Sequence, residues 1–344
     1  MIFAVSHTIS HTISHTTFRV SRILVCALCL FGASVMAFSP SAQAADWLYT
    51  VRPGDKLWSL ADKFCGSYTY WSELAKHNQL TQPTRLQPGT RLRIPLEWLI
   101  EEPASVRVIY ARGDTRLQKA DGTPAQPLSL GDTLTIEDTL ITGDESYANI
   151  QFADGSTLQI GPNSELVFDT LSAYRDTGMV DSRVRINRGS ASSEVKRQLG
   201  PGSVYRISTP LGVAAVRGTE FRTRTSGDAN FVETVGGAVE FLTGAGSTDV
   251  SKGFGLKADP YGVSVEELLA APALNPSTRS LGTNERVAWS SLTGAASYLV
   301  RIYSGPNLSE VLGGATVPTN DYALASLAPG SYVLGVRGVA ASGL

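Results

Sequence analysis

The order of apolar and polar residues changes in character along the chain. Residues 23–37 are a largely apolar run without charge, residues 46–96 mix alternating stretches with helical spacing, and from about Ser105 apolar and polar residues alternate in short runs. Alternation is typical of half-buried strands, and apolar residues at i, i+3, i+4 and i+7 are typical of one helix face. The sequence therefore predicts a multidomain, mainly β protein that begins with a small α/β module.

The stretch of residues 46–96 predicts two strands and two helices. Residues 47–51 and 92–94 alternate as on short strands. Residues 57–64 place apolar side chains at i, i+3, i+4 and i+7, and Trp71, with the apolar residues after it, marks the apolar side of a second helix. The predicted order is strand, helix, helix, strand.

Polar residues between these elements predict where the helices begin and where the chain turns. Asp55 is placed to cap the first helix and Thr69 the second, because such side chains accept hydrogen bonds from the free N–H groups of a first helical turn. Gln87 to Thr90 fits a type II turn, with proline and glycine at its two central positions.

The stretches YTVRPGDKLWSLA and LQPGTRLRIP, with Asn78 between them, resemble the lysin motif (LysM) family from Asp46 to about Leu96. The resemblance implies a βααβ fold that binds N-acetylglucosamine polymers, in bacteria chiefly peptidoglycan. It also implies a groove between the loop after the first strand and the loop before the last. The residues carried over to its two walls are Gly54, Asp55, Lys56 and Leu57, and Asn78, Leu80, Thr81, Pro83 and Leu86.

A structural role is an alternative for several of these residues. Leu57 and Leu86 also suit a hydrophobic core, and Asp55 also suits a helix cap alone. Asn78 also suits the end of a helix without touching a ligand. The aromatic stretch from Cys65 to Tyr70 either extends the groove or packs against the module.

From about Ser105 the chain predicts short strands only. Asp-Gly and Gly-Asp turn signals recur some ten residues apart, which indicates a sandwich, barrel or roll. The stretch of residues 148–160 predicts a hairpin around Asp154-Gly155. No earlier stretch favours a long helix, and the first run that does is Val265–Ala271.

This region resembles the FecR domain, named after an envelope regulator of ferric-citrate uptake, over residues 105–263. The stretches that carry the resemblance include LITGDESYANIQFADGSTLQIGPNSEL, RISTPLGVAAVRGTEF and VETVGGAVEF. Regulators of that kind have a sigma-factor-binding part and a membrane span before this domain. Here the LysM-like module stands there, so sigma regulation does not carry over. The most specific motif residues are Thr209, Pro210, Arg217, Gly218 and Thr219.

Three arginines lie in this motif or close after it. Arg217 is expected to be buried beside a carboxylate such as that of Glu220, since buried charges need such pairing. A contact with a partner protein is the other interpretation of Arg217. Arg222 and Arg224 alternate with threonines and are expected on a solvated strand face.

The C-terminal region predicts a linker over residues 264–284 and a further β-sandwich over 285–344. Trp289, the alternating stretch of residues 298–302 and the L-x-P-G-x-Y sequence at Leu327 resemble a fibronectin type III domain. A last strand of that fold is not seen before Leu344, so a partial domain is expected, either truncated or completed by another segment.

The N-terminal residues 1–44 have the pattern of a secretory signal peptide. They contain no Asp or Glu, Arg19 and Arg22 precede the apolar run, and Ala42-Gln43-Ala44 follows it. An uncleaved anchor is the alternative. Cleavage before Ala45 would leave Cys65 and His77 as the only cysteine and histidine, which excludes an internal disulfide and a Cys/His zinc site.

Composition and motifs narrow the function further. The 344 residues carry a formal net charge of −2, which argues against nucleic-acid binding through bulk positive charge. No G-x-S-x-G, P-loop or H-E-x-x-H motif occurs. We therefore predict a non-enzymatic protein of the bacterial periplasm or cell envelope without catalytic residues, metal or cofactor. It would bind peptidoglycan and present its FecR-like domain to an envelope protein. The alternatives are an anchored signalling regulator and, less favoured, a wall hydrolase.

Overall fold

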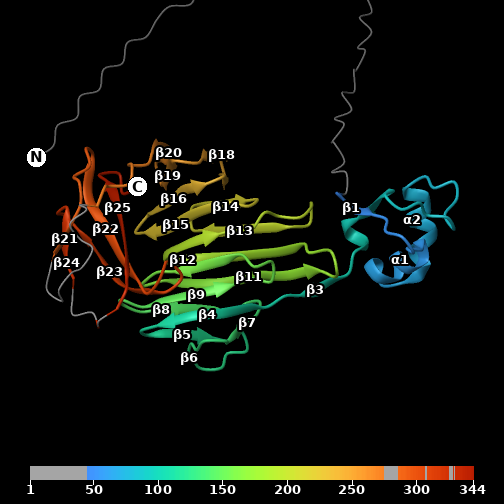
Figure 1. Cartoon of the computed structure of the whole chain (residues 1–344), viewed down its shortest axis with the longest axis horizontal. Coiled ribbons are helices and arrows are strands. Elements are labelled where there is room, and N and C mark those ends of the chain that lie inside the picture. The colour runs from blue at the N-terminus through green and yellow to red at the C-terminus, as the bar shows by residue number, and fades with distance from the viewer. Residues whose placement is uncertain (1–44, 275–285, 307, 325–327, 329) are drawn as a thin grey trace, which may run out of the picture. The chain divides into compact units, whose positions relative to one another are not determined.

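The computed structural model describes residues 45–274, 286–306, 308–324, 328 and 330–344. The predicted signal peptide, with Cys26 and Cys29, lies outside the described residues, as do residues 275–284 of the predicted linker. The described part is mainly β, as predicted, and its two α-helices lie near its N-terminal end (Figure 1). No helix among these residues is both apolar and long enough to span a lipid bilayer.

The N-terminal module has the predicted order of elements. They are β1 (Asp46–Thr50), α1 (Leu57–Cys65), the 3-10 turn η1 (Tyr68–Tyr70), α2 (Trp71–His77), β2 (Arg91–Pro95) and the 3-10 turn η2 (Leu96–Trp98). The two strands pair antiparallel, with Trp47 opposite Ile94. The predicted apolar positions of α1 are buried, and Leu74 and Ala75 of α2 complete that face. Burial of one face of each helix on this small sheet stabilises the module.

The predicted cap at Asp55 is wrong. Helix α1 begins at Leu57, so its cap position is Lys56, which makes no side-chain hydrogen bond to the helix. The Asp55 carboxylate instead accepts hydrogen bonds from the backbone N–H of Arg52 at 2.7 Å and the Tyr49 hydroxyl at 2.8 Å. Asp55 therefore fixes the turn that leads from β1 into the helix.

The predicted cap at Thr69 is also wrong. Thr69 lies inside η1, and its backbone N–H donates to the hydroxyl of Ser67 at 3.2 Å. Helix α2 follows η1 without a break, and the N–H of Trp71 already donates to the carbonyl of Tyr68. A side-chain cap is not needed where the preceding turn supplies the acceptors.

Two long sheets form the central β-domain, and they share one strand. The first sheet has the order β6-β5-β8-β11-β12-β13-β14-β17-β18, with β3 beside the far half of β11. The second has the order β7-β4-β9-β10-β12-β15-β16-β19-β20. The bounds are β3 Glu101–Pro103, β4 Val106–Arg112, β5 Thr115–Gln118, β6 Gln126–Pro127, β7 Thr133–Leu134, β8 Thr139–Thr142, β9 Tyr147–Gln151, β10 Thr157–Ile160, β11 Glu165–Tyr174, β12 Val180–Glu194, β13 Val204–Thr209, β14 Gly212–Val216, β15 Glu220–Ser226, β16 Ala229–Gly236, β17 Ala238–Thr243, β18 Gly246–Ser251, β19 Phe254–Asp259 and β20 Gly262–Glu267.

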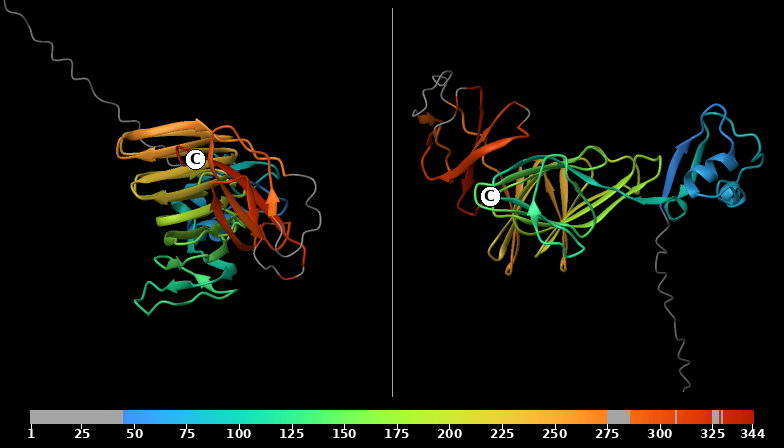
Figure 2. Two further views of the ribbon diagram at one scale, coloured as in Figure 1. Left: turned by 90° about the vertical axis from the view of Figure 1, so that its left-hand side faces the viewer. Right: turned by 90° about the horizontal axis from the view of Figure 1, so that it is seen from below.

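Strand β12 belongs to both sheets. Its first half, from Asp181 to Arg185, runs parallel to β13 in the first sheet. Its second half, from Gly189 to Glu194, pairs with β15 in the second. After β12 the chain alternates by hairpins between the sheets, and these hairpins lie one above another (Figure 2).

The main hydrophobic core lies between the two sheets. It takes Leu166, Ile207 and Phe241 from the first sheet and Ile150 and Val232 from the second, all fully buried. Inward and outward residues alternate along each strand, as the period-2 pattern predicts. The predicted hairpin of residues 148–160 is present, with β9 and β10 antiparallel.

Two boundaries of this domain differ from the prediction. Val265–Ala271 is not a helix, because β20 continues through Glu267 and pairs with β19. Residues 265–267 pair with β19, and the N–H of Leu268 donates to the carbonyl of Gly253 at 2.8 Å. A helix of seven residues would be marginal in water. The β structure also begins before residue 105, since Glu101–Pro103 pairs with β11.

The C-terminal region forms two small sheets. β21 (Arg286–Ala288) pairs with β24 (Asp321–Ala323), and β22 (Ala295–Tyr303) lies between β23 (Val311–Val317) and β25 (Val333–Ala340). Trp289, Tyr298 and Val300 are buried in their common core. Leu327 and Pro329 of the predicted corner lie outside the described residues, so the fibronectin-like assignment stays a prediction.

Candidate functional site

A cavity of about 370 Å³ opens on the N-terminal module. It is lined by residues from the start of α1, from the turn before α2 and from the loop before β2. These are Lys56, Leu57, Trp58, Tyr68, Trp71, Pro83 and Thr84. We call it the aromatic cavity, because three of its seven lining residues carry large rings.

The three rings are unusually exposed for residues of their size. Trp58 is 55% exposed, Tyr68 62% and Trp71 40%. Apolar side chains gathered on one surface, rather than scattered singly, mark binding sites. The Lys56 ammonium lies 5.8 Å from the centre of the Trp58 ring, which places a cation at the rim. The cavity therefore offers flat apolar faces beside a hydrogen-bond donor.

The backbone around the cavity is held by local hydrogen bonds. Gly54 has a φ of +91° next to the turn that Asp55 closes, a conformation that glycine adopts without strain. Burial and the hydrogen bond to Asp55 raise the pKa of Tyr49, which keeps that hydroxyl a donor. Gly66, at a φ of +76°, ends α1 and turns the chain toward Tyr68. The walls are therefore positioned by turns that the sequence dictates.

The predicted groove residues fall into three groups. Lys56, Leu57 and Pro83 line the cavity, with Leu57 buried to 2% at its base. Leu80 and Leu86 pack against the module core. Gly54, Asp55, Thr81 and Asn78 stand outside the cavity lining.

Asn78 connects helix α2 to strand β2. Its side-chain nitrogen donates to the carbonyls of Leu74 at 2.9 Å and Arg93 at 2.8 Å. Its side-chain oxygen accepts from the backbone N–H of Arg93 at 2.7 Å. Both amide hydrogens are therefore used within the module, which favours the structural interpretation of this residue.

Sequence reasoning missed Trp58 and Thr84, and it placed Trp71 on the buried side of α2. Tyr68 belongs to the aromatic stretch for which the sequence allows either extension of the groove or packing, and it lines the cavity. Trp58 follows the buried Leu57 and so lies off the apolar face of α1. A tryptophan on the polar face of a helix is a signal that could have been used. Trp71 has the spacing of the buried face, but it is the first residue of α2 and lies at the edge of the core.

The predicted FecR motif residues support the connections between strands. Thr209 closes the β13–β14 turn by donating to the Gly212 carbonyl at 2.8 Å, with Pro210 in the turn itself. Gly218 has a φ of +88°, and a Cβ there would lie 2.9 Å from the Cα of Arg197. Thr219 is buried and donates to the Ala238 carbonyl at 2.9 Å.

The expected burial of Arg217 is wrong. Arg217 is exposed in the bend between β14 and β15, and it makes no hydrogen bond or ion pair with any residue that the structure describes. Its place outside the strands explains the exposure, since the chain there crosses from one sheet to the other.

The expected solvated face of β15 is also wrong. Arg222 donates to the buried Glu233 at 3.1 Å, and the Arg224 guanidinium lies 3.8 Å from the centre of the Phe231 ring. Burial lowers the pKa of Arg224. The C-terminal residues cover this face, and Arg224 donates to the carbonyl of Gly343 at 2.5 Å.

Metal chemistry finds no support among the described residues. No cluster of three or more His, Cys, Asp or Glu side chains occurs in that part of the chain. Cys65 is buried in the core of the N-terminal module, and burial raises the pKa of its thiol from 9.0 to about 11. The thiol is therefore protonated at neutral pH and a poor nucleophile.

Comparison with known families matches two segments of the chain. Residues 49–95 match the LysM domain, and residues 138–240 match the family described as FecR protein. The chain thus contains a LysM module followed by a FecR-type β-domain. The predicted assignments of these two regions are confirmed.

Matches to individual proteins are partial. An uncharacterized protein from Deinococcus radiodurans is 36% identical over 64 residues, which are 19% of this chain and 25% of that protein. The chain thus spans a quarter of that relative's length. Two crystal structures of a provisionally assigned anti-sigma factor from Parabacteroides distasonis are 14% and 13% identical, with TM-scores of 0.33 and 0.32. Each match covers 38% of this chain and 59% of the solved one.

Proposed function

We propose that this chain is a non-enzymatic protein that binds N-acetylglucosamine-containing glycans, peptidoglycan above all, through the aromatic cavity. The observation that carries the proposal is the presence of three exposed rings, Trp58, Tyr68 and Trp71, around one cavity of the LysM module. A cavity of about 370 Å³ lies within the range of small-ligand sites.

The chemistry of the lining suits a sugar polymer. Sugar rings have apolar faces that pack on aromatic side chains, and their hydroxyl and acetamido groups need hydrogen-bond partners. Lys56 supplies a charged donor at the rim, and Thr84 supplies a hydroxyl. Rigid aromatic side chains lose little conformational entropy on binding, which favours affinity from a small contact area.

Sedimentation with purified peptidoglycan sacculi tests this proposal. The variant Trp58→Ala/Trp71→Ala should bind at least about tenfold more weakly than the wild type, a loss of about 1.4 kcal/mol or more. Tyr261→Ala is the matched control, because Tyr261 is 98% exposed and lies on the β-domain, away from the cavity. Equal binding by the double variant and the control would refute the assignment, provided both fold as judged by circular dichroism.

The FecR-type β-domain supports a second role, contact with a protein partner. Arg217 is an exposed arginine without a partner among the described residues, and it lies inside the FecR match. Arginines of this kind are enriched at protein interfaces. In vivo crosslinking from position 217 should capture an envelope protein, whereas crosslinking from Arg206 on β13, which is also exposed, should not. The same captured set from both positions would contradict a specific contact.

The location follows from the same assignment. LysM and FecR domains occur in envelope and extracytoplasmic proteins, and we place this chain in the bacterial envelope after export by residues 1–44. N-terminal sequencing distinguishes this from a signalling regulator with an uncleaved anchor, because cleavage gives a start at Ala45. A zymogram with clearing around the protein band would instead indicate a wall hydrolase.

A further inference from the structure

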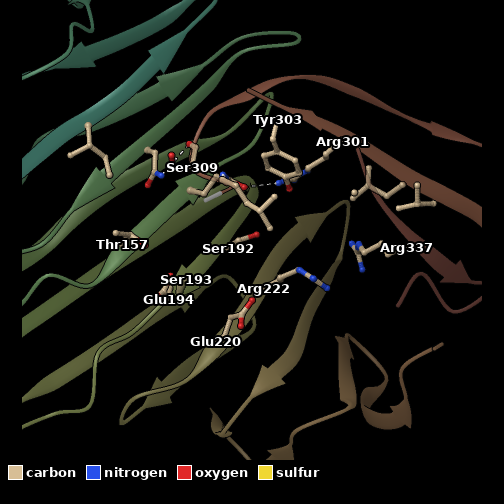
Figure 3. A pocket seen from close by; sticks show the side chains of 17 residues that line it. Thr157, Ser192, Ser193, Glu194, Glu220, Arg222, Arg301, Tyr303, Ser309 and Arg337 are labelled. Carbon is tan, nitrogen blue, oxygen red and sulfur yellow. Dashed lines mark hydrogen bonds between the residues drawn. The ribbon is translucent and has the colours of Figure 1, made fainter. Parts of the chain in front are cut away.

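A second cavity, of about 460 Å³, lies between the second sheet and the C-terminal sheet (Figure 3). One wall is formed by residues of β4, β9, β10, β12 and β15, and the other by β22, β25 and the segment before β23. We call it the arginine cavity, because three arginines line it. They are Arg222 from β15, Arg301 from β22 and Arg337 from β25.

A single buried carboxylate holds two of these arginines. Glu233 on β16 is 3% exposed, and its oxygens accept hydrogen bonds from Arg337 at 2.5 Å and from Arg222 at 3.1 Å. Arg301 instead donates to the neutral Gln159 side chain at 3.1 Å. Figure 3 shows Arg222 and Arg337 reaching from opposite walls toward one another.

Positive charge therefore exceeds negative charge around the arginine cavity. Two acidic residues line the cavity, and one of them, Glu194, is paired with Lys196 at 2.6 Å. Among the described residues, the charges of the three arginines are therefore opposed only by the carboxylates of Glu220 and Glu233. The arginines act on one another as well, since burial and the nearby charges of Arg222 and Arg301 favour a lower pKa for Arg337, against the pull of Glu233. Unbalanced charge in a partly enclosed site is stabilised by a counter-ion.

The arginines also keep hydrogen-bond donors that the protein does not use. Each guanidinium carries five N–H donors in a planar fork. The Nε of Arg337 is buried and has no acceptor among the described residues. Arg301 uses Nη1 for Gln159, and its remaining donors have no partner in the part of the chain that the structure describes. The planar fork of arginine matches the two oxygens of a carboxylate.

We propose that the arginine cavity binds a small molecule bearing carboxylates on an aliphatic skeleton. The carboxylates pair with Arg301 and Arg337, and the skeleton packs on Leu299, Leu308 and the ring of Tyr303 in the same cavity. The site lies outside the LysM module and does not depend on glycan binding. It is assembled only where the C-terminal sheet meets the β-domain.

Isothermal titration of the full chain with glutarate tests the proposal. Glutarate carries two carboxylates on three methylene groups, and glutaramide has the same skeleton without charge. The wild type should bind glutarate at one saturable site and should not bind glutaramide. Arg301→Gln should weaken glutarate binding at least about tenfold, whereas Arg206→Gln, which removes an exposed charge on the first sheet, should leave it unchanged.

The alternative is that the arginines only hold the C-terminal sheet in place. Arg301→Gln leaves Glu233 and its two partners intact, so loss of binding without loss of stability in urea would exclude that alternative. Three results overturn the proposal: no glutarate binding by the wild type, equal binding by Arg301→Gln, or equal loss in Arg206→Gln. Binding of the Arg301→Gln variant to sacculi should be normal, which separates this proposal from the glycan proposal.

Discussion

The aromatic cavity and the arginine cavity are built in opposite ways. All seven residues of the aromatic cavity lie between positions 56 and 84, within a single βααβ module. The arginine cavity takes residues from position 109 to position 337, and one of its two walls comes from the C-terminal strands and the segment before β23. A short module thus carries one site by itself, whereas the second site forms only where two layers of strands meet.

The two cavities differ in charge as strongly as in construction. Lys56 is the one charged residue among those that line the aromatic cavity, and its surface is dominated by rings. The arginine cavity contains five charged residues, and the buried Glu233 lies directly behind two of them. A substitution in one of these two regions should therefore leave the other region unchanged.

The largest effect is expected from Glu233→Gln. The substitution keeps the volume of the side chain but leaves Arg337 and Arg222 without their buried counter-charge. Removing one partner of a buried ion pair costs about 3–5 kcal/mol, and the partial exposure of both arginines favours the lower end. Urea unfolding should show a loss of about 3 kcal/mol while sacculus binding persists. A loss below about 1 kcal/mol would mean that Glu233 does not join the two layers.

Asn78→Ala should weaken the N-terminal module alone. The change removes one side-chain hydrogen bond to Leu74 of α2 and two to Arg93 of β2, which should cost about 2 kcal/mol. Gln82→Ala, an exposed amide in the next loop, is the control and should have no measurable effect. If Asn78→Ala abolished sacculus binding while the module remained fully folded, its interpretation as a structural residue would be wrong.

Cys65 should make the same module sensitive to alkali. The pKa of its thiol rises from 9.0 to about 11 in the fold, so the unfolded chain releases the proton first as pH rises. Stability is unaffected below pH 9 and falls between about pH 9 and pH 11, by about 1–2 kcal/mol after screening by solvent. Thermal unfolding of Cys65→Ala should lack this part of the decline. An identical pH profile for both proteins would contradict the burial argument.

The smallest effect concerns the face of β15 beside the arginine cavity. The Arg224 guanidinium lies 3.8 Å from the centre of the Phe231 ring, a geometry worth about 0.5–1 kcal/mol. A double-mutant cycle with Phe231→Leu and Arg224→Met should give a coupling energy of that size in urea unfolding. Strict additivity of the two substitutions would show that the contact adds nothing to stability.

Much of the N-terminal module could be predicted because its signals are local. The spacing of apolar residues predicts α1, and the Pro-Gly sequence at 88–89 predicts the turn before β2. Both predicted caps failed, because Asp55 is used in the turn before α1 and η1 supplies the acceptor at the start of α2. Trp58 was missed, and the role of Tyr68 was left open, because core periodicity identifies buried residues and says little about exposed residues that lie together.

The arginine cavity could not be predicted from the sequence. Arg222 and Arg224 alternate with threonines as on any half-exposed strand, and the pattern does not tell which layer covers the arginine side. Arg337 and Glu233 are 104 positions apart, a separation at which no local pattern indicates contact. Burial of the β15 face arises from tertiary packing alone.

Strand β12 has a consequence for how the β-domain loses its structure. Because its 15 residues hydrogen-bond to β11 and β13 in one sheet and to β10 and β15 in the other, neither sheet can peel away while β12 stays in place. The two layers are thereby joined into one cooperative unit, whose backbone amides along β12 exchange with solvent only on global opening.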